Sequence, residues 1–197
     1  MQVAAVSLTN PIFILFMAFA NMFGMGGSAA ASIAMGEKNE KRMKNVSSFI
    51  TYGSLITGIF FAVILLGLSK PILGIFGANK QTYDLAYRYL FHISYGAPFI
   101  IWSAAASFVV RSEGASKEAM IGTIANIVLD SIMISGFHMG AAIATTIGNV
   151  LASLYYIWYF IKKSKCFSIH PKYLKWTEKI LTSICSSGFP TAIFSVL

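Results

Sequence analysis

Residues 3–35, VAAVSLTNPIFILFMAFANMFGMGGSAAASIAM, form an apolar stretch without a single charged side chain. About 20 mostly apolar residues are enough for a helix to cross roughly 30 Å of hydrocarbon. This stretch is longer than that, and its proline, Pro11, lies near its beginning. It therefore predicts a membrane-spanning helix.

The composition of the whole chain agrees with a membrane protein. Its 197 residues are 56% hydrophobic and 11% charged, against roughly 45–50% and about 25% in soluble domains. A soluble globule of this size could not bury so much apolar surface. The composition also excludes a disordered chain and a coiled coil. Nucleic acid is excluded as a partner, because the net charge of +8 is spread over loops between apolar segments and forms no basic face.

Four further apolar segments are bounded by charged residues and are long enough to span a membrane. Asp130 is the one charge inside them, and Gly136 and Gly140 predict a tight turn between the last two. We therefore predict an all-α fold, a polytopic transmembrane helical bundle. Within residues 1–161 its five transmembrane helices cover about residues 3–35, 46–69, 89–110, 119–137 and 139–161.

The rest of the chain divides into a linker and the start of another helix. Residues 162–179 (KKSKCFSIHPKYLKWTEK) are basic with interspersed aromatic residues, a composition typical of a segment that lies along an anionic inner leaflet. Residues 180–197 are apolar up to the last residue without a closing polar flank. We expect them to be a truncated sixth transmembrane helix.

The basic residues predict the orientation in the plasma membrane, because Lys and Arg near helix ends stay cytoplasmic. Twelve of the fifteen lie in segments 36–45, 111–118 and 162–179, and three lie in the turns between them. We therefore expect these three segments to be cytoplasmic and the amino terminus to be outside. An exterior amino terminus is simplest to explain if another helix once preceded the first segment.

Asp130 is the most informative single residue. A carboxylate inside a spanning helix costs about 2.5–3.5 kcal/mol on insertion scales, and such groups usually face a cavity and bind an ion, a proton or a substrate. Asn126 lies one helical turn earlier on the same face. Together they could supply half a shell for Na⁺, or Asn126 could tune a proton-binding Asp130. The alternative is a helix-end cap, because Phe137 follows only seven residues later.

Other side chains are weaker candidates for a site. Tyr95, Phe99 and Trp102 recur at helical spacing and could line a substrate cavity for flat cationic ligands, or they could face lipid or pack in the core. The hydroxyl of Thr145 could reach a neighbouring site or bond to its own helix. The glycine-rich run 24–31 favours helix packing over a phosphate loop. No catalytic set and no metal cluster is visible, so we expect no enzyme activity and no metal beyond Na⁺ at Asp130.

Taken together, these residues resemble the multidrug and toxic compound extrusion (MATE) family, within the larger group of multidrug, oligosaccharide-lipid and polysaccharide flippases. Each phrase is weak alone, but their order makes the set specific. The phrases are Asn10-Pro11, MGEKN at 35–39, IFGA at 75–78, YL at 89–90, GAPF at 96–99, RSEG at 111–114, NIVLD at 126–130, AAIAT at 141–145 and GFP at 188–190.

The resemblance implies a fold of twelve helices in two lobes around a central cavity, and the chain would then be one incomplete lobe with helices two to six and the start of seven. It implies export of cationic or amphipathic organic compounds in exchange for Na⁺ or H⁺, with no other cofactor. It assigns Asn126, Asp130 and Thr145 to a cation-binding site, where the coupling ion at Asp130 competes with the drug. The expected partners are the lipid bilayer, these small compounds and the missing second lobe as a separate chain.

Departures from the family pattern leave alternatives open. The family's first helix, which supplies another Asp to the site, is absent from this sequence, and Ser131 stands where Pro commonly follows the Asp. One alternative is an inactive truncated product with a structural role only. Another is a flippase of lipid-linked oligosaccharides, for which more cationic residues inside the helices would be expected.

Overall fold

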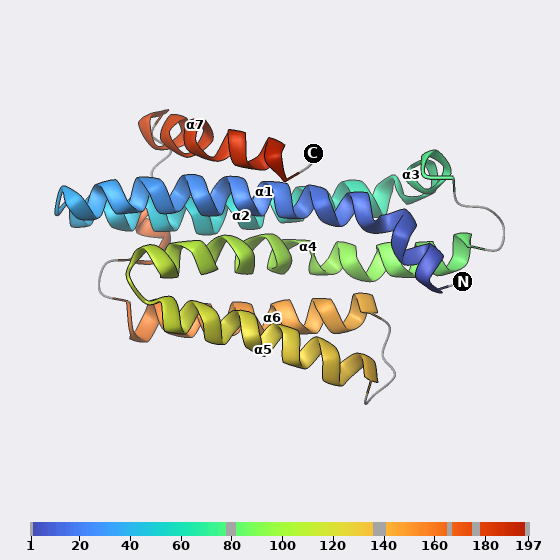
Figure 1. The fold of residues 1–197 in the computed structure, drawn as a ribbon. Coiled ribbons are helices and arrows are strands. Elements are labelled where there is room, and N and C mark those ends of the chain that lie inside the picture. The colour runs from blue at the N-terminus through green and yellow to red at the C-terminus, as the bar shows by residue number, and fades with distance from the viewer. Residues whose placement is uncertain (1, 78–81, 136–140, 165–166, 175–177, 196–197) are drawn as a thin grey trace.

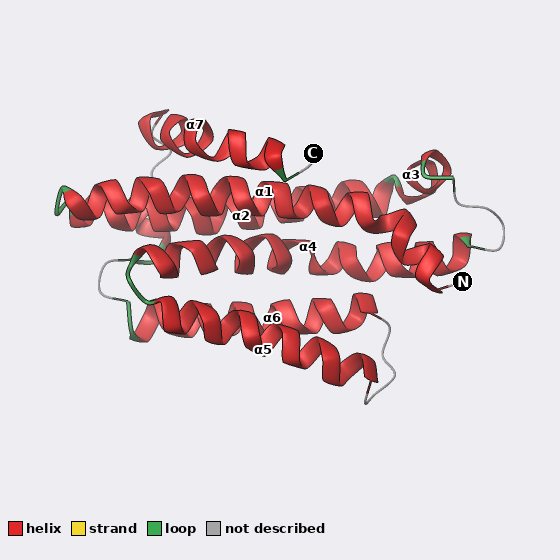
Figure 2. Ribbon diagram, in the orientation of Figure 1, coloured by secondary structure: helices red, strands yellow, loops and turns green. Residues whose placement is uncertain are grey.

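The computed structural model describes residues 2–77, 82–135, 141–164, 167–174 and 178–195. These residues are almost entirely helical and contain no strand (Figure 2). The elements in chain order are α1 (Gln2–Gly36), α2 (Glu40–Gly67), α3 (Ser69–Ile75), α4 (Tyr83–Ser112), α5 (Ser116–Ser135), α6 (Ala141–Lys162), the 3-10 helix η1 (Pro171–Tyr173) and α7 (Glu178–Phe194).

The long helices run side by side as a bundle (Figure 1). Helix α4 contacts α1, α2, α5 and α6, so it lies at the centre. Helices α5 and α6 pack against each other on one side of α4, and α7 packs against α1 on the opposite side. The ends of α1, α4 and α6, where the three basic segments begin, lie at the same end of the bundle (Figure 1).

The structure confirms the predicted all-α membrane bundle. Four helical segments are long and apolar enough to cross a membrane: Thr9–Gly36, Glu40–Gly67, Tyr83–Ser112 and Ala141–Lys162. The predicted segment 119–137 corresponds to α5 and runs into residues 136–140, which lie outside the described part of the chain. The turn predicted at Gly136 and Gly140 falls in that gap as well.

Two helices begin earlier than the charge pattern predicted. Helix α2 begins at Glu40 rather than at residue 46, because the side-chain oxygen of Asn39 accepts a hydrogen bond from the Arg42 backbone N–H at 3.0 Å and caps the helix. Helix α4 begins at Tyr83 rather than at residue 89 and carries Asp84 in its first turn. Charged residues marked the edge of the apolar segment, whereas the helix itself continues past that edge.

Small residues bring helices into backbone contact, as the run 24–31 predicted. A Cβ atom at Gly26 in α1 would strike the carbonyl oxygen of Ile184 in α7. Reciprocally, a Cβ atom at Gly188 would strike the carbonyl oxygen of Met22. The contact between α1 and α7 therefore depends on glycine at both positions.

Residues 167–174 of the linker are fixed to the first turns of α2. The Ser48 hydroxyl donates to the carbonyl oxygen of Ser168 at 2.8 Å, and the Tyr52 hydroxyl donates to the carbonyl oxygen of Ile169 at 3.0 Å. The Ser168 N–H in turn donates to Ser47 Oγ at 3.0 Å. These bonds tie the chain after α6 back to the end of α2 that carries the basic residues.

Candidate functional site

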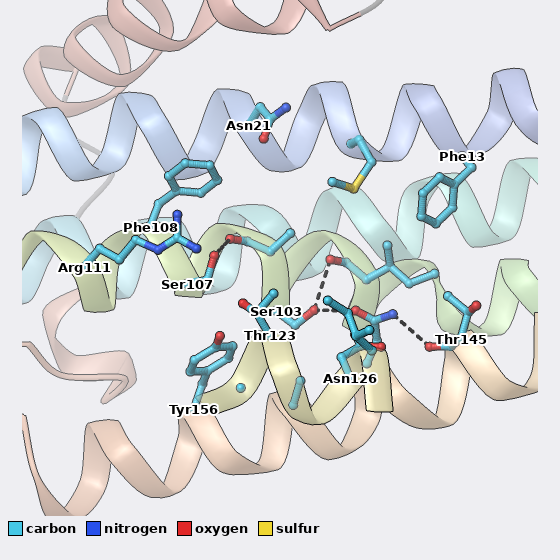
Figure 3. A pocket seen from close by; sticks show the side chains of 17 residues that line it. Phe13, Asn21, Ser103, Ser107, Phe108, Arg111, Thr123, Asn126, Thr145 and Tyr156 are labelled. Carbon is cyan, nitrogen blue, oxygen red and sulfur yellow. Dashed lines mark hydrogen bonds between the residues drawn. The ribbon is translucent and has the colours of Figure 1, made fainter. Parts of the chain in front are cut away.

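A pocket of about 350 Å³ lies between α1, α4, α5 and α6. Its volume is in the range of small-molecule sites, which enclose roughly 300–1,000 Å³. Each of the four helices contributes polar side chains to an otherwise apolar wall (Figure 3). The polar lining residues are Asn21 from α1, Ser103, Ser107 and Arg111 from α4, Thr123 and Asn126 from α5, and Thr145, Asn149 and Tyr156 from α6.

A hydrogen-bonded chain joins α4 to α6 in the middle of the pocket. The Ser103 hydroxyl donates to Asn149 Oδ1 at 2.8 Å, and Asn149 Nδ2 donates to the Thr145 carbonyl oxygen at 2.8 Å. Asn149 is only 8% exposed, and both ends of its amide are engaged. Burying a polar group costs free energy unless it is hydrogen-bonded, so these bonds make Asn149 a stable part of the wall.

Two of the three predicted cation-binding residues meet in this pocket. Asn126 from α5 and Thr145 from α6 both line it, although α5 and α6 are separate helices. No hydrogen bond joins the Asn126 amide or the Thr145 hydroxyl to another described residue. By contrast, the hydroxyl of the neighbouring Thr146 bonds back to the Ala142 carbonyl oxygen at 2.8 Å.

Asp130, the third predicted residue, lies in α5 one turn after Asn126. Its side chain is outside the described part of the structure, and its place relative to the pocket stays a prediction. Among the described residues, no group of three or more His, Cys, Asp or Glu side chains could hold a metal ion.

The predicted aromatic cavity is not formed at this pocket. Tyr95 is 56% exposed, Phe99 is 38% exposed and Trp102 is 2% exposed, and none of the three lines the pocket. Tyr95 packs instead against Phe91 on the same helix, with ring centroids 4.9 Å apart, and Trp102 belongs to the hydrophobic core. The three residues are spaced to share one face of α4, but exposure falls along that face from Tyr95 to Trp102.

Arg111 and Asn149 are pocket residues that the sequence reasoning did not single out. The Arg111 guanidinium lies over the Phe108 ring, 5.5 Å from its centroid, at one end of the pocket (Figure 3). Asn149 follows Thr145 by four residues, the same spacing that drew attention to Asn126 and Asp130. Thr145 and Asn149 thus form a second polar pair one helical turn apart, and this pattern could have identified Asn149 from the sequence.

Two sets of polar contacts join neighbouring helices at the basic end of the bundle. Glu113 accepts hydrogen bonds from the Tyr159 hydroxyl at 2.8 Å and the Ser164 hydroxyl at 2.9 Å. Lys163 donates to Glu118 at 2.9 Å. This hydrogen bond lowers the pKa of Glu118 and raises the pKa of Lys163, because each charged form stabilises the other.

Comparison with known proteins agrees with this geometry. The MatE family model matches residues 1–135. The multidrug export protein MepA of Staphylococcus saprophyticus is 38% identical over 203 residues, a match that covers 100% of this chain and 45% of the relative. MepA of Staphylococcus aureus is 37% identical with the same coverage.

Solved structures show the same relationship. A multidrug resistance MATE family transporter of the MOP superfamily in its inward-facing conformation has a TM-score of 0.88 and 28% sequence identity, over 99% of this chain and 46% of the other. The chain spans about half the length of the curated relatives it matches. With its helical bundle, its candidate spans and these matches, the chain belongs to the MATE family of multidrug transporters.

Proposed function

We propose that this chain forms one lobe of a cation-coupled antiporter that exports cationic or amphipathic organic compounds across the plasma membrane. The single observation that carries the proposal is the pocket, where the amide of Asn126 and the hydroxyl of Thr145 meet without partners among the described residues. Polar groups in a membrane protein that face a cavity usually serve an ion or a substrate.

The proposed coupling residue is Asp130, with Asn126 and Thr145 as neighbouring oxygen donors. Carboxylate, amide and hydroxyl oxygens suit a hard cation such as Na⁺, and a carboxylate in a low-dielectric site also takes up a proton readily. In this mechanism the coupling ion, Na⁺ or H⁺, competes with the drug for the lobe, and helix rearrangement alternates access between the two sides.

The proposed orientation places segments 36–45, 111–118 and 162–179 in the cytoplasm and the amino terminus outside. Support comes from the ends of α1, α4 and α6, where these segments begin. They lie together at one end of the bundle (Figure 1), where Lys and Arg would face the inner side of the membrane. Cysteine labelling of intact cells tests this orientation: a cysteine introduced at Thr82 should react from the exterior, whereas one introduced at Lys41 should not. Labelling at position 41 alone would contradict it.

Coupling is tested by binding of a cationic dye, ethidium, to the full 197-residue chain in lipid nanodiscs. We expect Na⁺ or a lower pH to release ethidium from the unmodified chain. Asp130→Asn should remove this competition, because an amide neither loses a proton nor carries the charge that attracts Na⁺. Asp84→Asn, the same change in the first turn of α4, is the matched control. Equal behaviour of the two variants would contradict the assignment of Asp130.

Transport is tested separately by ethidium efflux from cells that produce the same chain. Efflux that depends on Asp130 supports the complete proposal. Binding with ion competition but without efflux would limit the proposal to the binding lobe, and the chain alone would then have no export activity.

A further inference from the structure

Arg111 is the only charged side chain among the residues that line the described pocket. It lies in the last turn of α4, and Figure 3 shows its guanidinium group beside the Phe108 ring, on the side of the pocket that also holds Ser107 and Tyr156. The other polar groups of the described lining are neutral amides and hydroxyls. One end of the pocket is therefore positively charged.

No described carboxylate neutralises this charge. Two other cations at the same end of the bundle pair with carboxylates: Arg42 with Glu37 at 2.7 Å, and Lys163 with Glu118 at 2.9 Å. Glu113, two residues after Arg111, accepts hydrogen bonds from Tyr159 and Ser164. Among the described residues, no ion pair or hydrogen bond engages the Arg111 guanidinium, which lies over the face of Phe108.

A structural role accounts for part of this arrangement. A cation in the last turn of a helix interacts favourably with the helix dipole, and a guanidinium over an aromatic ring gains a cation–π interaction. Neither contact uses the N–H donors of the guanidinium. These donors form a planar fork that matches a carboxylate, sulfonate or phosphate group with two parallel hydrogen bonds.

We propose that the pocket binds an amphipathic ligand with one acidic group, and that this group pairs with Arg111. The apolar part of the ligand would extend away from Arg111 towards Phe13, which lies on the opposite side of the pocket (Figure 3). This ligand class lies beyond the cationic compounds of the proposed function. The acidic group belongs either to a soluble organic acid or to an anionic lipid of the surrounding bilayer.

A pair of probes that differ only in charge tests the proposal. The full 197-residue chain is placed in nanodiscs of phosphatidylcholine and titrated with dansyl-aminoundecanoic acid or with its primary amide, and empty nanodiscs give the background. We expect the acid to bind at least about tenfold more tightly than the amide, since a hydrogen bond to a charged group is stronger than one to a neutral group. Higher salt should weaken binding of the acid and leave the amide unchanged.

Substitutions assign the effect to Arg111. Arg111→Gln should reduce the affinity for the acid to that for the amide, and Arg111→Lys should retain part of the difference, because lysine keeps the charge but lacks the fork. Arg88→Gln is the matched control, since Arg88 is an exposed arginine near the other end of α4 and does not line the pocket. We expect it to bind both probes like the unmodified chain.

Phosphatidylglycerol in the nanodiscs distinguishes the two sources of the acidic group. Displacement of the dansyl acid from the unmodified chain by this lipid identifies a lipid headgroup, whereas unchanged binding identifies a soluble acid. Equal affinity for acid and amide in the unmodified chain would overturn the proposal without any variant. Equal effects of Arg111→Gln and Arg88→Gln would overturn it as well. Neither result depends on Asp130, so cation coupling and acid binding fail or succeed separately.

Discussion

Two asparagine side chains in the same pocket differ in what holds them. Asn149 is 8% exposed and uses both ends of its amide, towards Ser103 and the Thr145 carbonyl oxygen. Asn126, on the adjacent helix, faces the same space without a hydrogen bond to another described residue. A satisfied buried amide stabilises the wall, whereas an amide that keeps its hydrogen-bonding capacity can serve a ligand. Residue type and location alone do not separate these roles.

The largest expected effect comes from removing the Asn149 amide, because both of its ends are hydrogen-bonded. Asn149→Ala removes two hydrogen bonds and leaves the buried Ser103 hydroxyl without this acceptor. We expect the unfolding free energy to fall by about 1–3 kcal/mol, measured by thermal or denaturant unfolding in detergent. Asn126→Ala is the matched control and should stay within about 0.5 kcal/mol of the unmodified chain. Similar losses in both variants would show that the two amides do not differ in role.

A smaller effect is expected at the partner of Asn149. Ser103→Ala should lower the unfolding free energy by about 0.5–1.5 kcal/mol, the net contribution of one hydrogen bond. The double variant with Asn149→Ala should lose less than the sum of the two single losses, because both substitutions remove the same bond. Additive losses would indicate that the bond between Ser103 and Asn149 contributes nothing measurable.

The adjacent residues Thr145 and Thr146 on α6 allow the same comparison, measured by ligand binding instead of stability. The Thr146 hydroxyl bonds to the Ala142 carbonyl oxygen at 2.8 Å and to the His92 carbonyl oxygen at 3.2 Å, while Thr145 lines the pocket. Thr145→Val should weaken the competition between Na⁺ or H⁺ and ethidium about tenfold, as loss of one ligand hydrogen bond would. Thr146→Val should leave that competition unchanged. A loss of competition in Thr146→Val but not in Thr145→Val would contradict the assignment of Thr145 to the cation site.

The sequence predicted the membrane helices better than the residues at which they begin. Apolar length identifies a membrane helix because the bilayer has a fixed thickness, so α1, α2, α4 and α6 were found from hydropathy. Helix starts were less accurate, because Asn39 caps α2 through a side-chain bond that lies outside the apolar segment. The short helix α3 was not predicted, since it follows α2 after the single residue Leu68.

The pocket could be predicted only in part. Spacing within one helix placed Asn126 near Asp130, but the arrival of Ser103 and Arg111 from α4 depends on how α4, α5 and α6 pack together. The same limit explains the aromatic residues of α4. Tyr95 and Trp102 share a face by spacing, yet one is exposed and the other is in the core, because coverage by neighbouring helices changes along α4.

The smallest expected effect concerns the ion pair between Glu118 and Lys163. It lies outside the pocket, and it contrasts with Arg111, which has no ion pair among the described residues. Because the pKa of Glu118 is lowered from its ordinary value of 4.5, its contribution to stability is present above that value and is lost as the pH falls through the lowered pKa. Because the pKa of Lys163 is raised from 10.5, its contribution is present below 10.5 and is lost as the pH rises through the raised pKa.

The difference in melting temperature between the unmodified chain and Glu118→Gln should therefore be largest near neutral pH and should shrink towards both extremes. It should be small and decrease with salt, since the Lys163 side chain is 52% exposed and exposed ion pairs are screened. Glu40→Gln, which removes the looser pair with Lys44 at 3.7 Å, is the control and should show a weaker pH dependence. A constant difference across the pH range would mean that Glu118 acts through packing rather than through its charge.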